Sequence, residues 1–313
     1  MQRREVIYGL TASLALGRGL PAGAQATRPR KVGVVASEAH LHEAVVAGLR
    51  ELGWDPGRDI EVLRAGAGTL EDIDHLLQWE PEVLVTGGAV RIVHAAQRAP
   101  KKPIIAIDLE SDPERSGFVQ SLSRPGGSIT GIWLDMPDMA GKLIELLKEI
   151  VPELSRCAVL WDERFGIPQI EATERAAANS GIAVERLVIN ESRKPEPLIT
   201  DTSAGALIVL TSPSIFVQRA KIAAAANARH IPSISIFPDY ARAGGLMGYG
   251  PSLTGMFQRS ARYVDAVLLG RLPAELPVER PTRFEFILNQ RTANAIRLLF
   301  PVRLLAGADE VIE

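Results

Sequence analysis

Pro81-Glu-Val-Leu-Val-Thr-Gly-Gly88 contains a short apolar, β-branched run that ends in a pair of glycines. Such a run, bounded by turn-forming residues, is typical of a buried strand. The glycines allow a tight turn into the helical stretch that follows, which continues through Arg98. A strand that turns directly into a helix is the repeating unit of α/β folds, so this segment predicts a parallel sheet.

The same alternation of strand and helix continues on both sides of this segment. Strands of a first unit are predicted at residues 31–36, 60–63, 81–86 and 103–107. After a Pro- and Gly-rich stretch the pattern starts again, with strands of a second unit at 156–161, 184–189, 206–210 and 233–237. We therefore expect an α/β protein of two Rossmann-like lobes, each a parallel sheet flanked by helices.

Two local signals refine this pattern. Thr69 precedes a helical stretch and Asp72 follows three positions later, which predicts a helix that begins after residue 69. In the second unit, Pro195 and Pro197 occupy a segment where a helix should follow a strand. Because proline is tolerated only in the first turn of a helix, we expect that helix to be short or to begin late.

The N-terminus has the organisation of a cleaved export leader. Arg3 and Arg4 precede an apolar run over residues 6–16, and Ala24-Gln-Ala26 offers a small-residue cleavage site. The run is about half the roughly 20 residues that a membrane span needs. We therefore expect residues 1–26 to be a signal peptide, by the general or the twin-arginine route, and the mature protein to be periplasmic.

Composition and motifs exclude several classes of function. The formal net charge of the 313-residue chain is −2, so nothing attracts nucleic acid through bulk charge. Cys157 is the single cysteine, and the five histidines are scattered, so neither a disulfide nor a metal site is predicted. The sequence contains no P-loop, dinucleotide or nucleophile-elbow motif. We expect no cofactor and no enzymatic activity.

The predicted ligand site follows from the topology. In open α/β sheets, ligands bind beyond the carboxyl ends of the strands, and two facing sheets would form a cleft there. The polar and glycine residues at these ends are Ser37, Thr86, Gly87, Gly88, Asp108, Asp112, Asp162 and Ser212. The Gly pair either brings backbone N–H groups to a ligand carboxylate or only makes a tight turn. The carboxylates of Asp108, Glu110 and Asp112 cluster before Pro113. They either accept hydrogen bonds from a ligand ammonium group or belong to a solvated loop in which Ser111 or Asp112 caps the turn, and a general acid–base role is the remaining alternative.

Aromatic side chains concentrate at the strand ends of the second unit. They are Trp161, Phe165, Phe216, Phe237 and Tyr240. Aromatic rings at such positions provide apolar walls for a ligand, although strand-end aromatics also fill the core. We expect two or three of these five to line the cleft.

Several longer motifs carry a family resemblance over nearly the whole mature chain. They are Leu49-Arg-Glu-Leu-Gly-Trp-Asp-Pro-Gly-Arg58, Ser123-Arg-Pro-Gly-Gly-Ser-Ile-Thr-Gly131, Ala243-Gly-Gly-Leu-Met-Gly-Tyr-Gly-Pro251 and Leu276-Pro-Val-Glu-Arg-Pro-Thr-Arg-Phe-Glu-Phe286. In these the sequence resembles the ABC transporter substrate-binding proteins of the tryptophan/tyrosine type. The resemblance implies the type I periplasmic binding protein fold and closure of the lobes on a ligand.

The resemblance also implies a domain organisation and partners. The hinge would have three crossings, near Leu134, Pro251 and Ala274. The first lobe would then hold residues 27–134 plus 251–274, and the second would hold 135–250 plus 275–313. The expected function is capture of a small organic solute, such as an amino acid or related carboxylate, for an ABC permease by a monomeric protein. The alternatives are a ligand-sensing receptor of the same fold and, less favoured, an exported α/β enzyme.

Overall fold

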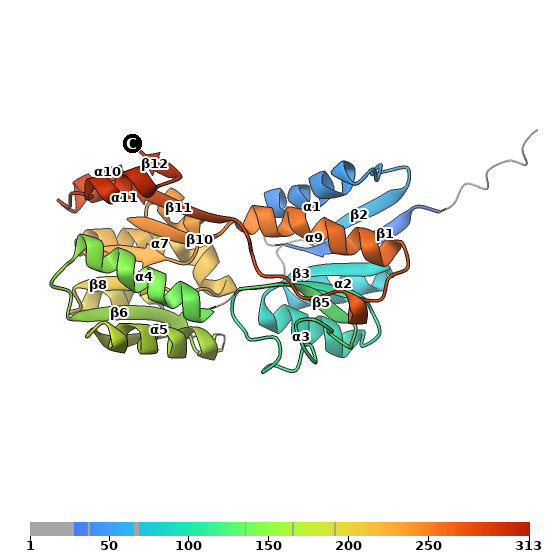
Figure 1. Cartoon of the computed structure of the whole chain (residues 1–313), viewed down its shortest axis with the longest axis horizontal. Coiled ribbons are helices and arrows are strands. Elements are labelled where there is room, and N and C mark those ends of the chain that lie inside the picture. The colour runs from blue at the N-terminus through green and yellow to red at the C-terminus, as the bar shows by residue number, and fades with distance from the viewer. Residues whose placement is uncertain (1–27, 37, 66–68, 135, 165, 191) are drawn as a thin grey trace, which may run out of the picture.

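The computed structural model describes residues 28–36, 38–65, 69–134, 136–164, 166–190 and 192–313 (Figure 1). The predicted leader, Ser37 and Phe165 therefore lie outside the described residues. The described chain forms two α/β lobes that lie side by side, joined by extended segments (Figure 1).

The first lobe is built on a five-stranded, fully parallel sheet of order β2-β1-β3-β4-β5. Its strands are β1 (Arg30–Val35), β2 (Ile60–Ala65), β3 (Val83–Gly87), β4 (Ile104–Asp108) and β5 (Ile129–Trp133). Its helices are α1 (Ala39–Glu51), α2 (Leu70–Gln78), α3 (Ala89–Arg98) and α9 (Leu253–Leu268).

Alternation along β3 explains how helices cover both faces of this sheet. Val83 and Val85 pack into the core shared with α1 and α9, whereas Leu84 packs with the buried residues of α2 and α3. Successive side chains of a strand point to opposite faces, so a strand buried on both faces is apolar at every position. The run that predicted a buried strand is therefore the central strand of the sheet.

The second lobe holds a seven-stranded sheet of order β12-β11-β10-β9-β8-β6-β7, parallel except for the antiparallel pair β10–β11. Its strands are β6 (Arg156–Asp162), β7 (Ala183–Ile189), β8 (Ala206–Val209), β9 (Ser233–Ser235), β10 (Met247–Pro251), β11 (Phe284–Asn289) and β12 (Glu310–Ile312). Its helices are α4 (Met136–Ile150), α5 (Ile167–Asn179), α6 (Pro195–Asp201), α7 (Pro213–Ala228), α8 (Pro238–Arg242), α10 (Gln290–Ala295) and α11 (Val302–Gly307). The order of the strands agrees with the two-lobed expectation.

Both local predictions are confirmed. The Thr69 hydroxyl accepts a hydrogen bond from the Asp72 backbone N–H at 3.2 Å, and the Asp72 carboxylate accepts one from the Thr69 N–H at 2.9 Å. This reciprocal pair fixes the start of α2. The proline-containing helix α6 is short, with seven residues, and begins at Pro195 in the first turn, where no N–H is needed.

The chain passes between the two sheets three times. The first passage separates β5 from α4, and the second separates β10 from α9, which packs on α1. The third comes later than the expected position near Ala274. The 3-10 helix η1 (Pro273–Glu275) contacts β5, and the Glu279 N–H donates to the Gly131 carbonyl at 2.9 Å. We therefore propose that the first lobe extends through residue 280 and that Pro251, the last residue of β10, belongs to the second lobe.

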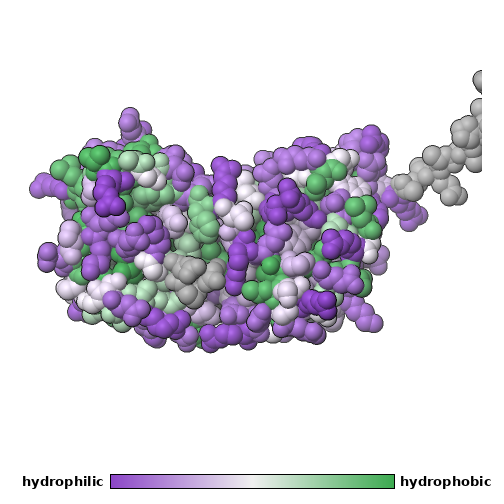
Figure 2. Space-filling view, in the orientation of Figure 1, coloured by the Kyte–Doolittle hydropathy of each residue, from purple (hydrophilic) through white to green (hydrophobic). Residues whose placement is uncertain are grey.

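The visible face of the molecule is mainly hydrophilic, with hydrophobic side chains scattered over both lobes (Figure 2). Within the described ranges, no helix combines the length and the apolar character needed to cross a bilayer.

Candidate functional site

Residues at the carboxyl ends of both sheets meet at a small cavity of about 60 Å³ between the lobes. The first lobe contributes Ala36, Leu41, Gly87, Gly88, Arg91, Ile107, Leu109, Glu110, Leu253 and Phe257. The second lobe contributes Thr211, Ser212, Pro213, Phe216 and Phe237. This is the place at which the topology of two facing parallel sheets predicts a ligand site.

The wall of the cavity on the second lobe is aromatic. The rings of Phe216 and Phe237 pack edge to face, with 4.9 Å between their centroids and an angle of 66°. Both side chains are buried, and Phe257 on α9 faces the same cavity. Three phenylalanines around one space favour a ligand with an apolar or aromatic part.

On the first lobe, the cavity contains a buried carboxylate, Glu110. Its side chain is 4% exposed and accepts a hydrogen bond from the Ala89 N–H at 3.3 Å, at the start of α3. Burial, followed by the negative charge of Asp108, raises the pKa of Glu110 well above its usual range. In the described part of the chain, no Lys, Arg or His lies within ion-pair distance of this carboxylate. The cavity therefore holds an acid that forms no ion pair within the described residues.

The Gly87-Gly88 turn brings Glu110 to the start of α3. Gly88 has φ of 86°, a backbone conformation that glycine adopts without strain. A Cβ atom at Gly88 would lie 3.6 Å from Pro213 of the opposite lobe and 3.7 Å from the Glu110 carboxylate. Arg91, one turn into α3, is desolvated, which lowers its pKa, and interacts electrostatically with Glu110. The turn thus lets the two lobes and the acid approach one another closely.

The two aspartates predicted near this loop hold its backbone instead. The Asp108 carboxylate is fully buried and accepts hydrogen bonds from the Glu110 N–H at 2.9 Å, the Trp133 indole N–H at 3.2 Å and the Ser111 hydroxyl. Burial raises the pKa of Asp108 to about 6. Asp112 accepts from the N–H groups of Glu114 and Arg115, at 3.0 Å each. Neither aspartate lines the cavity, and both make the turn contacts that the sequence left open as the alternative.

The predicted acid of the second lobe, Asp162, is already paired with a cation. Asp162 accepts two hydrogen bonds from the Arg164 guanidinium, at 3.0 and 2.9 Å. The Ser212 hydroxyl lies 3.4 Å from the same carboxylate and also accepts from the Ile215 N–H at 3.1 Å, which caps α7. Asp162 and Arg164 therefore support the edge of the cavity as a closed ion pair.

Two predicted aromatic residues lie away from the cavity. The Tyr240 ring is buried in the core of the second lobe, and its hydroxyl donates to the Ser233 hydroxyl at 2.9 Å. Burial raises the pKa of Tyr240. Trp161, at the end of β6, packs in the core beneath Arg186, whose guanidinium lies 6.0 Å from the ring centroid. We therefore leave Tyr240 and Trp161 out of the candidate site.

Several buried polar atoms around the site have no hydrogen-bond partner among the residues that the structure describes. The hydroxyl of Thr211 lines the cavity, and that of Thr86 sits at the end of β3, beside the Gly87-Gly88 turn. The Arg219 Nε on α7 also has no partner. Buried polar groups are normally hydrogen-bonded, so unsatisfied ones that gather at a cavity mark a place where a polar ligand can bind.

An ion pair joins the two lobes next to the aromatic wall. Arg219 Nη2 lies 2.8 Å from Glu38 Oε1 of the first lobe, and Arg219 Nη1 donates to the Phe216 carbonyl at 2.8 Å. The guanidinium also lies over the Phe216 ring, 4.2 Å from its centroid. Sequence reasoning did not find this pair, because nothing along the chain relates a loop of one lobe to a helix of the other. Glu110 carried a signal, since it follows β4 by two residues.

Within the described residues, no group of three or more His, Cys, Asp or Glu side chains is arranged to hold a metal ion.

Similar proteins agree with this architecture. The family model described as "ABC transporter substrate binding protein" matches residues 37–312. A curated relative, a tyrosine-binding protein of Clostridioides difficile (strain R20291), is 23% identical over 262 residues, which cover 80% of this chain and 74% of the relative.

Two solved structures share the fold. A conserved domain protein of Vibrio cholerae is 21% identical and has a TM-score of 0.84, covering 91% of this chain and all of the other. An ABC domain of Streptococcus pneumonia in complex with L-Trp is 20% identical and has a TM-score of 0.82, with the same coverage. These likenesses confirm the predicted fold class, two helix-flanked sheets of the type I periplasmic binding protein fold. Together with the family model over most of its length, they lead to one conclusion: the chain belongs to the ABC transporter substrate-binding protein family.

Proposed function

We propose that this protein is the extracytoplasmic binding component of an ABC importer and captures an amino acid with an apolar or aromatic side chain between its lobes. The observation that carries the proposal is Glu110, a buried acid that forms no ion pair among the described residues and lies in a cavity walled by Phe216 and Phe237. An amino acid matches this arrangement, because its ammonium group supplies the missing cation and its side chain covers the rings.

The remaining contacts of the proposed site come from both lobes. Gly87, Gly88 and Arg91 lie where a ligand carboxylate can meet backbone N–H groups and a guanidinium. The hydroxyls of Thr211 and Thr86, which lack partners, are further candidates to bind polar ligand atoms. The printed descriptions of two similar proteins, one tyrosine-binding and one in complex with L-Trp, support this ligand class.

Lobe movement is part of the proposed mechanism. A cavity of about 60 Å³ is well below the roughly 300 Å³ at which small-molecule sites begin. A ligand as large as tyrosine therefore enters only when the lobes separate, and it leaves the walls further apart than they are here. A ligand can contact both lobes at once only when they close around it, so binding shifts the population toward the closed state that a permease would recognise.

Isothermal titration calorimetry of the mature protein tests the ligand class. L-Tyr, L-Trp and L-Leu are titrated in parallel with indole-3-propionate, which lacks the ammonium group. We expect at least one amino acid to bind and indole-3-propionate to bind much more weakly. Glu110→Gln should weaken amino acid binding by about tenfold or more, because a charge-assisted hydrogen bond is lost.

The matched control for this test is Glu153→Gln, an exposed glutamate of the second lobe. It should bind the amino acid as the parent does. Equal affinity of the parent and Glu110→Gln for every amino acid that binds would overturn the assignment of Glu110. Failure of all three amino acids to bind would overturn the ligand class.

Export is proposed from the leader of residues 1–26, with cleavage after Ala26. Expression of the full chain in a bacterial host, followed by fractionation and N-terminal sequencing, tests it. A periplasmic product that begins at Thr27 is expected, and a cytoplasmic product that retains Arg3 and Arg4 would contradict the proposal.

A further inference from the structure

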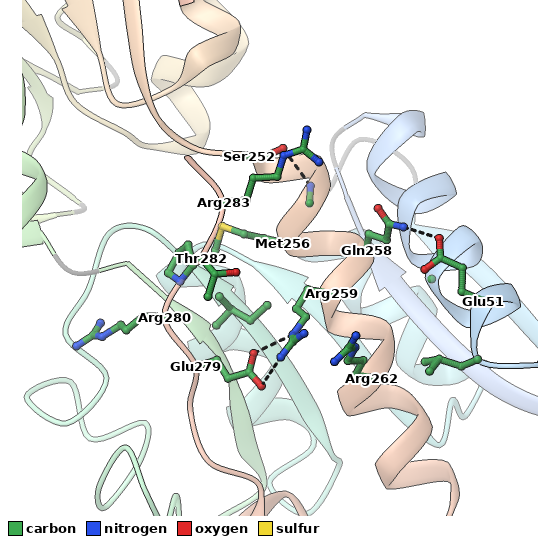
Figure 3. A pocket seen from close by; sticks show the side chains of 15 residues that line it. Glu51, Ser252, Met256, Gln258, Arg259, Arg262, Glu279, Arg280, Thr282 and Arg283 are labelled. Atoms are coloured by element: carbon green, nitrogen blue, oxygen red, sulfur yellow. Dashed lines mark hydrogen bonds and ion pairs between the residues drawn. The ribbon is translucent and has the colours of Figure 1, made fainter. Parts of the chain in front are cut away.

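A second cavity lies at the hinge, away from the candidate site between the lobes. It has a volume of about 460 Å³, within the range of small-molecule sites and far larger than the space between the lobes. Its lining comes from the C-terminal end of α1, from Ile132 on β5, from the first half of α9, and from the third crossing, residues 279–283 (Figure 3).

The crossings of the hinge are hydrogen-bonded to one another beside this cavity. The Ser252 N–H, in the second crossing, donates to the Arg283 carbonyl at 3.2 Å. The Arg280 guanidinium, in the third, donates to the carbonyls of Trp133 and Leu134 at 3.2 and 2.9 Å. In Figure 3, the Arg280 side chain points away from the other labelled residues. The cavity is thus built on the connections between the lobes.

The charge of the lining is predominantly positive. Four arginines contribute to it, Arg259, Arg262, Arg280 and Arg283, against two glutamates, Glu51 and Glu279. Both glutamates are engaged. Arg259 binds Glu279 through two hydrogen bonds, at 2.9 and 3.1 Å, and the Gln258 amide donates to Glu51 at 2.7 Å.

Two cationic side chains of this cavity remain available to a ligand. In the described part of the chain, neither Arg262 nor Arg283 has a carboxylate within ion-pair distance. Glu285, which interacts electrostatically with Arg283, is held in an ion pair by Arg242 at 2.9 Å. Both arginines are exposed, so their guanidinium groups can turn toward a bound molecule.

The positions of these two arginines indicate the shape of the ligand. In Figure 3, Arg283 lies at the upper edge of the labelled group and Arg262 at its lower edge, with Arg259 between them. The Arg283 carbonyl accepts a hydrogen bond from the Ser252 N–H at the start of α9. Arg262 lies ten residues after Ser252 on this helix, which is roughly 15 Å along the helix axis. Leu52, Ile132 and Met256 also line the cavity and give it apolar surface. Two separated cations and apolar surface in one cavity are complementary to an elongated molecule with an acid group at each end.

We propose that this hinge cavity is a binding site for an elongated organic dianion, whose acid groups bind Arg262 and Arg283. Guanidinium groups bind carboxylates through paired N–H donors, and this geometry favours a dicarboxylate over a neutral molecule of the same length. The site is distinct from the cavity between the lobes, since the two cavities share no lining residue.

The test titrates the mature protein with adipate, a six-carbon diacid, and with hexanoate, which has the same length and one acid group, at low ionic strength. Saturable binding of adipate is expected, and hexanoate should bind about tenfold more weakly or worse, because one charge-assisted contact is missing. The double variant Arg262→Gln/Arg283→Gln should lose adipate binding by about tenfold or more. Arg303→Gln, an exposed arginine of α11 outside the cavity, should bind as the parent does.

Three outcomes would overturn the proposal. These are the absence of saturable adipate binding, equal affinity for adipate and hexanoate, and unchanged adipate affinity in the double variant. The circular dichroism spectrum and melting temperature of the double variant verify that it is folded, and both side chains are exposed, so the fold should tolerate the change.

Discussion

Each lobe has a buried acid at the carboxyl end of a strand, and the two acids differ in their partners. In the first lobe, Glu110 follows β4 and has no cation within ion-pair distance among the described residues. In the second lobe, Asp162 ends β6 and accepts hydrogen bonds from both Nε and Nη2 of Arg164. A buried charge without a partner is costly, whereas a paired one is partly compensated. The first lobe thus leaves its strand-end acid without an ion pair, which we propose serves a ligand, while the second lobe pairs its own acid and supplies the apolar wall.

The largest expected effect is on stability. Replacing each acid by its amide should change the free energy of unfolding in opposite directions in the two lobes. Asp162→Asn breaks the ion pair with Arg164 and should lower the free energy of unfolding by about 1–2 kcal/mol, a value reduced because Arg164 is partly exposed. Glu110→Gln removes an uncompensated buried acid while its side-chain oxygen still accepts from Ala89, and should raise the free energy of unfolding by about 1 kcal/mol. Urea denaturation at pH 7.5 without ligand measures both. A loss of stability in both variants would break the comparison.

The second prediction concerns the pH dependence of the first lobe. The pKa of Asp108 is raised from 3.8 to about 6 by burial, so the folded protein holds its proton at a pH where the unfolded chain has released it. The contribution of Asp108 to stability should therefore fall as the pH rises from about 4 to about 6. Asp108→Asn should flatten this part of the profile, whatever its effect on absolute stability.

Thermal denaturation of the parent and Asp108→Asn at intervals between pH 4 and pH 7 measures the difference. Because the charge of Asp108 also raises the pKa of Glu110, its removal acts on both titrations in the same direction. Parallel profiles for the two proteins would contradict the assignment of a raised pKa to this pair of acids.

The regular strands of both lobes, and therefore the residues at their ends, could be predicted from the sequence. Buried strands such as β3 are recognisable because apolar residues occupy both faces, and the ends of parallel strands must meet at one edge. This is why Gly87, Gly88, Phe216 and Phe237, named from the sequence, line one cavity.

The direction of each side chain beyond a strand end was not predictable. Past the last strand residue the alternation of faces stops, and the local turn decides the orientation. Asp108 turns inward to accept from the Glu110 N–H, so that Glu110, and not Asp108, faces the cavity. Tyr240 enters the core because Ser233 offers its hydroxyl a partner. The later third crossing that we propose has a similar origin, since Glu279 joins the first sheet through an isolated bridge with Ile132, which leaves no periodic pattern in the sequence.

The smallest expected effect concerns the contact between the two lobes. The pair Glu38–Arg219 bridges them at 2.8 Å and should stabilise the conformation in which they touch. Its worth is limited, because both side chains are partly exposed and the His40 ring, 3.3 Å from Glu38, offers the carboxylate a second partner. A double-mutant cycle with Glu38→Gln and Arg219→Gln, read out as affinity for the tightest-binding amino acid, should give a coupling of about 0.2–1 kcal/mol, or up to about fivefold in Kd. Arg219→Gln alone should cost more than Glu38→Gln alone, because it also removes the guanidinium from the Phe216 ring. A coupling of zero would mean that the lobes close without help from this pair, and that the asymmetry between a paired and an unpaired acid is confined to the cavity.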